Sequence, residues 1–258
     1  MVKNYTDLTG RVAVVIGGTS GLGRAIALGL AAAGAAVVAT GRRQKLVDEV
    51  SAAIAKLGRE SLNYSVNVSD RKSVDTLRDA VLARFGKVDV LVNAAGRTKR
   101  TPTKDLPEQE WEDILDTNLT GILRSCQSFY QPLAQSGHGR IINIASLSSF
   151  VGLYEVAAYC ASKSAVLSLT RSLAVEWSKV GINVNAIAPG VFRTDLNSAL
   201  LDGTERGREF LMRTPMQRFG KAEELIGAAV LLASDAASYI TGQSIAVDGG
   251  FLASGVNT

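Results

Sequence analysis

A tyrosine and a lysine four residues apart, Tyr159 and Lys163, are the side chains of this sequence best suited to move a proton. Residues four apart on a helix lie on the same face, so this phenol and this amine would lie close together. A tyrosine with a pKa of about 10 exchanges protons poorly near neutral pH, but a neighbouring ammonium group lowers that pKa. The pair therefore predicts an acid–base tyrosine tuned by Lys163, although many tyrosine–lysine pairs at this spacing only pack against the protein.

The elements that would position this pair alternate between short β-branched runs and longer helical patterns. This alternation is typical of an α/β fold with a parallel sheet buried on both faces. We expect seven strands, at residues 11–16, 36–40, 62–67, 88–92, 140–145, 182–187 and 244–247. We expect helices at 21–33, 43–57, 70–85, 107–135, 156–179 and 222–233. No linker or repeat divides the chain, so residues 1–258 are predicted to form one domain.

Composition excludes several classes of function. The net charge of +4 comes from scattered residues without a run of like charges, which argues against nucleic-acid or membrane partners. The single histidine, His138, and the two cysteines, Cys126 and Cys160, have no metal-ligand spacing, so we expect neither a metal site nor a histidine-based triad. The first residues lack an apolar stretch of signal-peptide length, which favours a cytoplasmic protein.

A glycine-rich turn follows the first predicted strand and opens a helix, with glycines at Gly17, Gly21 and Gly23. Such a turn lets the backbone approach a pyrophosphate and presents free N–H groups at the positive end of a helix. At the end of the second strand stand Arg42 and Arg43 and no acid. An arginine there suits the 2′-phosphate of NADP, whereas a carboxylate would suit the ribose of NAD, so NADP(H) is the favoured cofactor.

One connection is unusually long. Residues 192–220 separate the sixth strand from the last helix, and connections of this length are usually functional loops. We expect a substrate lid there, with a surface insertion as the alternative.

Seven motifs together resemble the short-chain dehydrogenase/reductase family over the whole chain. They are the turn 17–23, Asn93-Ala94-Ala95-Gly96, Asn118, Ser146, Tyr159 with Lys163, Pro189-Gly190, and Asp248-Gly249-Gly250. The resemblance implies a Rossmann-type, doubly wound sheet with strand order 3-2-1-4-5-6-7, a nicotinamide cofactor and a catalytic tetrad of Asn118, Ser146, Tyr159 and Lys163. It also implies cofactor contacts at Gly17, Thr19, Ser20, Gly21, Leu22, Gly23, Arg42, Arg43, Asn67, Val68, Asn93, Ala94, Ala95, Gly96, Tyr159, Lys163, Pro189, Gly190, Val191 and Thr194.

Two residues depart from the family pattern. Ile16 stands where a threonine is usual, so a hydrogen bond between the glycine turn and the Asn93 segment is in doubt. Asn67 replaces a common aspartate at the adenine, where its amide oxygen can still accept a hydrogen bond.

The residues assign each member of the tetrad a role and a structural alternative. Tyr159 would donate a proton to the carbonyl oxygen that receives a hydride at its carbon, and Ser146 would orient that oxygen. By resemblance, Lys163 also holds the nicotinamide ribose and Asn118 positions a water. The alternatives are a strand-end cap for Ser146, a polar helix-interior residue for Asn118 and a surface amine for Lys163.

The sequence says least about the substrate. Four cations at residues 97–104, with Arg193, Arg213 and Arg218 near the expected lid, suit an anionic substrate, but solvated loop charges explain them equally well. Within the family the chain looks most like gluconate 5-dehydrogenase-type enzymes, with 3-oxoacyl-acyl-carrier-protein reductase as the alternative. A catalytically silent dinucleotide-binding regulator is an alternative of another class. The resemblance also implies a homotetramer formed through helices 107–135 and 156–179.

Overall fold

The computed structural model describes residues 4–194 and 198–255. Within these residues, six parallel strands form one sheet in the order β2-β1-β3-β4-β5-β6. The strands are β1 (Val12–Ile16), β2 (Ala36–Thr40), β3 (Val90–Asn93), β4 (Gly139–Ile144), β5 (Ile182–Pro189) and β6 (Ser244–Val247). All of β1, β3 and β4 is buried, because helices cover both faces of the sheet and a parallel strand between two layers must be apolar on both sides.

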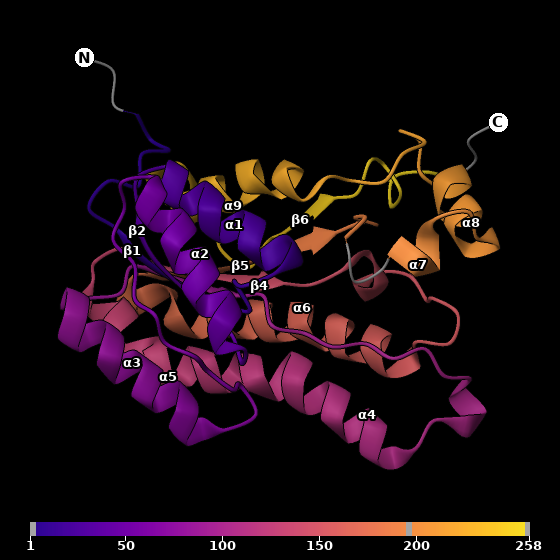
Figure 1. The fold of residues 1–258 in the computed structure, drawn as a ribbon, viewed down its shortest axis with the longest axis horizontal. Coiled ribbons are helices and arrows are strands. Elements are labelled where there is room, and N and C mark those ends of the chain that lie inside the picture. The colour runs from indigo at the N-terminus through magenta and orange to yellow at the C-terminus, as the bar shows by residue number, and fades with distance from the viewer. Residues whose placement is uncertain (1–3, 195–197, 256–258) are drawn as a thin grey trace.

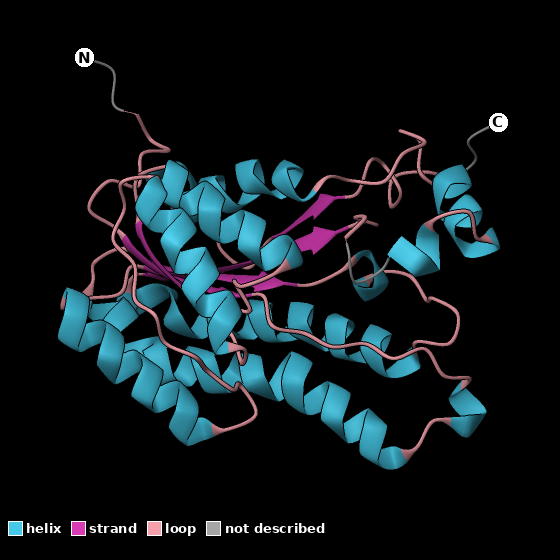
Figure 2. Cartoon of the chain, viewed as in Figure 1, coloured by secondary structure: helices cyan, strands magenta, loops and turns pink. Residues whose placement is uncertain are grey.

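Helices cover both faces of the sheet (Figures 1 and 2). On one face, side chains of α1 (Gly21–Ala32), α2 (Gln44–Lys56) and α9 (Ile226–Ala233) pack against every second residue of the strands, such as Ala13 and Val15. On the other face, α3 (Arg71–Phe85), α5 (Gly121–Gln135) and α6 (Ala157–Trp177) pack against the alternate residues, such as Val14. The protein therefore has the three-layer, doubly wound arrangement of a Rossmann-type fold.

The predicted seven-stranded sheet is wrong, because residues 62–67 form no strand. This segment does run beside β2, and Val66 N donates to the carbonyl of Gly41. At its other end, however, the hydroxyl of Ser61 donates to Val37 O (2.8 Å), a carbonyl that a parallel ladder would pair with a backbone N–H. Side-chain bonds thus take the place of the regular ladder. The other six predicted strands lie in the predicted order, and only the edge strand at residues 62–67 is missing.

The predicted helix at 107–135 is also corrected. It consists of α4 (Glu108–Leu115), a π-helical turn at Asp116–Thr120 and α5. In the π turn the N–H of Gly121 bonds to the carbonyl of Asp116, five residues earlier. Such turns insert one extra residue into a helix and occur often at functional sites. Here the turn carries Asn118, which is completely buried.

The predicted lid, residues 192–220, contains α7 (Ser198–Leu201) and α8 (Glu205–Arg213), and its residues 195–197 lie outside the described residues. In Figure 2 the strand arrows point toward these two helices. The segment therefore lies beyond the carboxyl ends of the strands, where open α/β sheets bind their ligands.

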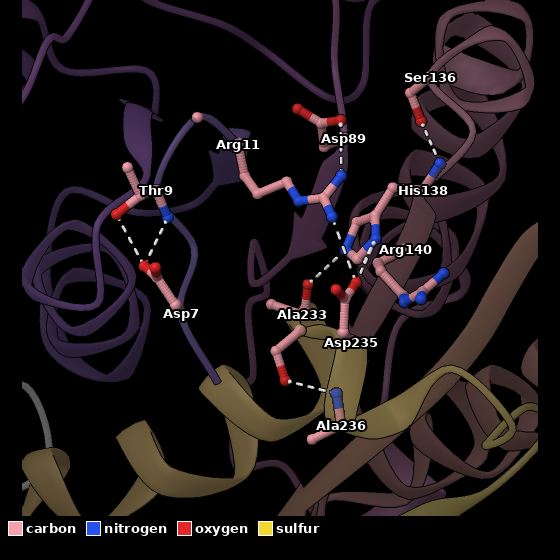
Figure 3. A network of polar contacts seen from close by, with 12 residues as sticks. Asp7, Thr9, Arg11, Asp89, Ser136, His138, Arg140, Ala233, Asp235 and Ala236 are labelled. Atoms are coloured by element: carbon pink, nitrogen blue, oxygen red, sulfur yellow. Dashed lines mark hydrogen bonds and ion pairs between the residues drawn. The ribbon is translucent and has the colours of Figure 1, made fainter. Parts of the chain in front are cut away.

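A polar network centred on buried Asp89 and His138 holds the opposite, amino ends of the strands together (Figure 3). The carboxylate of Asp89 accepts a hydrogen bond from Val12 N (2.8 Å) and lies 3.1 Å from Lys87 Nζ. Arg11 lies between two acids, 3.8 Å from Asp89 and 3.2 Å from Asp235. These contacts join the starts of β1 and β3 to the turn that follows α9.

His138 extends this network to the start of β4. Its Nε2 lies 3.1 Å from the carbonyl of Ala233 and its Nδ1 lies 3.0 Å from Asp235. Burial and the guanidinium groups of Arg140 and Arg11 lower the pKa of His138, while Ala233 O and Asp235 act in the opposite direction. The only histidine of the chain thus takes part in a structural cluster far from the lid helices. Within the described part of the chain, no helix has the length and apolar character needed to cross a membrane.

Candidate functional site

Three elements bring the proposed tetrad to the carboxyl ends of the strands. Helix α6 carries Tyr159 and Lys163, Ser146 follows β4, and the π turn between α4 and α5 carries Asn118. Ser146, Lys163 and Asn118 are buried, with 8%, 4% and 0% of their surfaces exposed, and Tyr159 is half-buried. None of the four is therefore a freely solvated surface group.

The side chain of Ser146 lies beside that of Tyr159. Burial raises the pKa of Tyr159, and the hydrogen bond from Ser146 opposes this shift. Ser146 also caps the short turn after β4, because its Oγ accepts from Ser148 N at 3.1 Å. The strand-end cap considered as an alternative is thus present, and the same hydroxyl also contacts Tyr159. At neutral pH the phenol is protonated and able to donate.

Lys163 lies beneath the tyrosine, with Nζ 5.8 Å from the centre of the Tyr159 ring. The amine donates to the carbonyl of Ile144 at 2.7 Å, and burial lowers the pKa of Lys163 to about 8. The expected lowering of the tyrosine pKa does not appear in this structure, because the cost of burying the phenolate outweighs the other contributions. The spacing correctly predicts that the amine and the phenol share a face, but burial determines the direction of the shift.

Asn118 uses its whole amide to hold the loop after β3. Oδ1 accepts from Arg97 N (2.8 Å), while Nδ2 donates to Arg97 O (2.9 Å) and to Ser162 Oγ (3.0 Å). Ser162 in turn donates to the carbonyl of Tyr159 at 2.7 Å. Asn118 therefore fixes Gly96 and Arg97 beside α6, and a β-carbon built on Gly96 would lie 3.7 Å from Lys163 Nζ. The helix-interior alternative for Asn118 is too simple, because its amide holds three contacts outside its own helix.

The glycine turn after β1 is tightly packed and leaves the start of α1 uncapped. Gly17 has a φ of 83°, and a β-carbon there would lie 2.4 Å from Ala95 N, so only glycine fits. A β-carbon on Gly23 would lie 2.1 Å from the carbonyl of Gly17. Ser20 precedes α1 without bonding to the helix through its side chain. The first N–H groups of α1 are thus available to an anion, as a pyrophosphate requires.

Both predicted 2′-phosphate ligands lie at the end of β2, next to this turn. The guanidinium of Arg43 reaches Ser20 Oγ at 3.5 Å, which brings a cation from the start of α2 to the turn. Arg42 is exposed. Thr19 is buried against Gly41, where a β-carbon would lie 2.8 Å from Thr19 Oγ1. The glycine turn and the arginines therefore form one continuous surface.

The other predicted cofactor residues surround the same region. Ala94, Ala95 and Gly96 follow β3, while Leu22 lies on α1 and Gly21 lies where a β-carbon would be 3.9 Å from Thr194 Cγ2. Pro189 ends β5, and Gly190 and Val191 follow it. This segment lies against β6, since Gly190 N donates to Val247 O (2.9 Å). Val68 is a buried core residue beside Gly121, whereas Asn67 is exposed and its Oδ1 accepts from Ser69 N (3.2 Å).

Ile16 has the consequence expected from the sequence. It stands beside Asn93 in the sheet register, and the buried side-chain oxygen of Asn93 has no hydrogen-bond partner in the part of the chain that the structure describes. The amide nitrogen of Asn93 instead donates to Asn143 Oδ1 (2.9 Å). No hydroxyl at position 16 is present to satisfy that oxygen.

Comparison with known proteins agrees with this geometry. A family model described as "Enoyl-(Acyl carrier protein) reductase" matches residues 16–252. The chain belongs to the short-chain dehydrogenase/reductase family. It is accordingly an oxidoreductase, and the resemblance inferred from the sequence motifs is confirmed.

Two relatives and one solved structure illustrate the similarity. The chain is 41% identical over 256 residues to the 2-dehydro-3-deoxy-D-gluconate 5-dehydrogenase of Dickeya dadantii (strain 3937), covering 98% of this chain and 100% of the relative. It is 38% identical over 244 residues to the 3-oxoacyl-(acyl-carrier-protein) reductase of Escherichia coli (strain K12), covering 95% and 98%. A gluconate 5-dehydrogenase from Burkholderia cenocepacia J2315, crystallised with NADP and tartrate, superposes with a TM-score of 0.94 at 35% identity, covering 98% and 99%.

In this short-chain dehydrogenase, the cations at residues 97–104 and near the predicted lid are largely neutralised by acids. Every cation that the sequence analysis named there has a carboxylate partner within 4 Å. The pairs are Arg97 with Glu110 and Asp113, Lys99 with Glu110, Arg100 with Glu155, Lys104 with Asp105, Arg193 with Asp202, Arg213 with Glu209, and Arg218 with Glu224. The number of cations in these segments therefore does not by itself indicate an anionic substrate.

Two residues of this region were missed by the sequence analysis. Ser162 links Asn118 to the backbone of Tyr159, and its place three residues after Tyr159 could have suggested it. Glu155 has a φ of 62°, in the left-handed region that favours glycine, and no sequence signal indicates this conformation.

A cavity of about 390 Å³ lies between the ends of β5 and β6 and the segment at 214–220. Val191, Arg218 and Asp248 are among its lining residues, whereas the tetrad is not. This cavity therefore adjoins the predicted lid and does not contain the proton-transfer group.

Proposed function

We propose that this short-chain dehydrogenase is an NADP(H)-dependent enzyme that interconverts a secondary alcohol and a ketone on a small sugar acid. The observation that carries the proposal is the placement of the Tyr159 ring 5.8 Å from the buried amine of Lys163, with Ser146 beside the phenol at the end of β4. Titratable groups with shifted pKa values that lie together at the carboxyl ends of parallel strands are candidates for a functional site.

The chemistry follows from these side chains. NADPH, when bound, supplies the hydride to the carbonyl carbon. As negative charge develops on the carbonyl oxygen, Tyr159 donates its phenolic proton to it and Ser146 donates a hydrogen bond. Lys163, whose pKa is about 8, is charged at neutral pH and favours the phenolate that Tyr159 becomes. In the oxidative direction the phenolate accepts the proton of the alcohol.

The residues around the glycine turn fit the cofactor. The uncapped start of α1 suits the pyrophosphate, and Gly17 leaves room for a close approach of the backbone. Arg42 and Arg43 would pair with the 2′-phosphate, since a guanidinium binds a phosphate through two hydrogen bonds. The NADP bound to the Burkholderia enzyme supports this choice.

The substrate class rests on the relatives. The Dickeya enzyme is named for a keto sugar acid, and the Burkholderia enzyme was crystallised with tartrate, a dicarboxylate. The similarity to the Escherichia coli reductase makes a 3-oxoacyl thioester the second candidate. We propose residues 192–220 as the substrate cover, within one domain of residues 1–258.

A substrate screen tests the proposal. Oxidation of NADPH is followed at 340 nm with 5-ketogluconate and acetoacetyl thioesters. Reduction of NADP⁺ is followed with 2-dehydro-3-deoxygluconate, whose C5 hydroxyl would be oxidised. Each assay is then repeated with NADH or NAD⁺. We expect the highest kcat/KM with NADPH and a keto sugar acid. Preference for the thioester would replace the first candidate with the second, and no turnover of either class would contradict the proposal.

We also propose that the enzyme acts in the cytoplasm as a homotetramer. Apolar side chains exposed on the helices predicted to associate support this, namely Trp111 of α4 and Val175 of α6, which are 38% and 78% exposed. Light scattering after size-exclusion chromatography measures the mass, and a monomer at micromolar concentration would contradict the proposal.

A further inference from the structure

Arg206 is a cation of the predicted lid that contacts the segment just before α6. It lies on α8, is half-buried, and stacks on Phe210 with its guanidinium carbon 5.4 Å from the ring centre. Its Nη1 lies 3.3 Å from the carbonyl of Tyr154, to which it donates. Because Tyr154 lies just before α6, this contact joins the lid helix to the segment that leads into Tyr159.

Arg206 has no carboxylate within 4 Å among the residues that the structure describes. Burial and the charge of Arg100 lower its pKa, while Glu209, Glu155 and Cys160 act in the opposite direction. Both acids are already paired more closely with other arginines, Glu155 with Arg100 at 2.5 Å and Glu209 with Arg213 at 3.4 Å. The positive charge of Arg206 therefore has no close acid partner among the described residues, and it acts on Cys160, the residue after Tyr159.

The backbone next to Arg206 is held in an unfavourable conformation. Glu155, at φ 62°, accepts a hydrogen bond from Thr101 N at its carbonyl (2.8 Å) and bonds to Arg100 through its carboxylate. A residue with a β-carbon rarely adopts this conformation, and such strain is concentrated at binding sites. These contacts pair Arg100 with Glu155, whereas Arg206 has no carboxylate this close among the described residues.

We propose that Arg206 binds the carboxylate of the substrate and so makes the enzyme select keto acids over neutral ketones. A guanidinium binds a carboxylate through two parallel hydrogen bonds, and stacking on Phe210 orients the guanidinium before the substrate arrives. The inference rests on the proposed function, because it assumes a sugar-acid substrate. It also explains how the enzyme can recognise an anion although the other cations near the lid are paired with acids.

The experiment compares a charged substrate with a neutral copy of it. KM and kcat are measured with 5-ketogluconate and with its methyl amide, for the wild-type enzyme, Arg206→Gln and Arg206→Lys. In Arg206→Gln we expect KM for the acid to rise about 10- to 100-fold, the effect of losing a charged hydrogen-bonded pair. The KM for the amide and both kcat values should change by less than about threefold. For Arg206→Lys, the KM for the acid should lie between the wild-type value and that of Arg206→Gln.

Arg208→Gln is the matched control. Arg208 lies on the same helix, is exposed, and donates to Gly203 O within the lid. Equal kinetics of Arg206→Gln and Arg208→Gln on the acid would overturn the inference while the proposed function stands. An equal rise in KM for acid and amide would also overturn it, because the role would then be structural. A wild-type enzyme that reduces only acyl thioesters would remove both the proposed function and this inference. Circular dichroism confirms that each variant is folded.

Discussion

The two ends of the sheet use buried polar groups in opposite ways. At the amino ends, the buried carboxylate of Asp89 faces Arg11, and Arg11 also faces Asp235 (Figure 3). At the carboxyl ends, Lys163 is equally buried, but its partner is the neutral carbonyl of Ile144, and no carboxylate of the described residues lies within 4 Å of it. The cost of burying a charge without a counter-ion lowers the pKa of Lys163 to about 8.

This difference separates stability from function. A compensated network such as that of Asp89 fixes the strands, whereas an uncompensated amine next to a phenol contributes little stability and can exchange protons. Substitutions at the carboxyl ends should therefore change catalysis with little effect on folding, and those at the amino ends should do the reverse.

The largest effect is expected for Tyr159→Phe. Removing the proton donor should lower kcat by about 10³-fold or more while NADPH still binds. Stopped-flow or steady-state assays give kcat, and quenching or enhancement of NADPH fluorescence gives the affinity. Tyr239→Phe, at a fully exposed tyrosine, should retain wild-type activity. Unchanged turnover of Tyr159→Phe would remove the assignment.

A smaller effect at the same end is expected for Arg42→Asp. Replacing a cation with an acid beside the 2′-phosphate should raise the KM for NADPH about 100-fold and leave the KM for NADH within about threefold. Lys45→Asp introduces the same change of charge at an exposed position of α2 and serves as the control. Equal effects of Arg42→Asp on both cofactors would mean that the phosphate binds elsewhere.

Substitutions at the amino ends of the strands should change the free energy of unfolding. Asp89→Ala leaves the Val12 N–H without its acceptor and Arg11 and Lys87 without a shared acid, so we expect a loss of about 2–3 kcal/mol in the free energy of unfolding. Urea denaturation measures it. Asp79→Ala, which breaks a surface pair with Arg78, should cost under about 1 kcal/mol. A large drop in the kcat of folded Asp89→Ala protein would contradict the separation of the two ends.

The smallest effect is expected from pH at His138. Folding lowers the pKa of His138, so at acidic pH the unfolded chain binds more protons than the folded one. The free energy of unfolding should therefore keep its full His138 contribution above about pH 6.5. Below that pH it should decrease by at most about 1.4 kcal/mol per pH unit. Urea denaturation at pH 7.5 and 5.5 should show this decrease in the wild type and a smaller one in His138→Gln. The chain has one histidine, so its single imidazole resonance reports the pKa directly by NMR. A value above 6.5 would contradict the prediction.

The fold was predictable wherever one local pattern determined one element. The β-branched runs that became β1 and β2 are buried on both faces, and the glycine turn lies between β1 and α1 as expected. Residues 62–67 have the same kind of pattern but lack the ladder, because the Ser61 hydroxyl bonds to β2 where a backbone N–H would. Strand formation depends on partners distant in sequence, and a local pattern does not contain them.

The candidate site was predictable in its positions and less so in its electrostatics. The four-residue spacing placed Lys163 beneath Tyr159, but the direction of the tyrosine pKa shift depends on burial by the surrounding layers. The loop cations suited either an anionic substrate or solvation. In the folded protein, acids of α4 and Glu155 pair with them instead. Such pairings come from segments far apart in sequence.

The sequence by itself determined the alternation of elements, the glycine turn and the placement of a phenol and an amine on one helical face, because these follow from steric limits and the helical repeat. Only the tertiary structure decided that the sheet of the described residues has six strands, that the π turn carries Asn118, and that Arg206 has no carboxylate within 4 Å among those residues. Burial and charge pairing are properties of the space between elements, and that space exists only after the chain has folded.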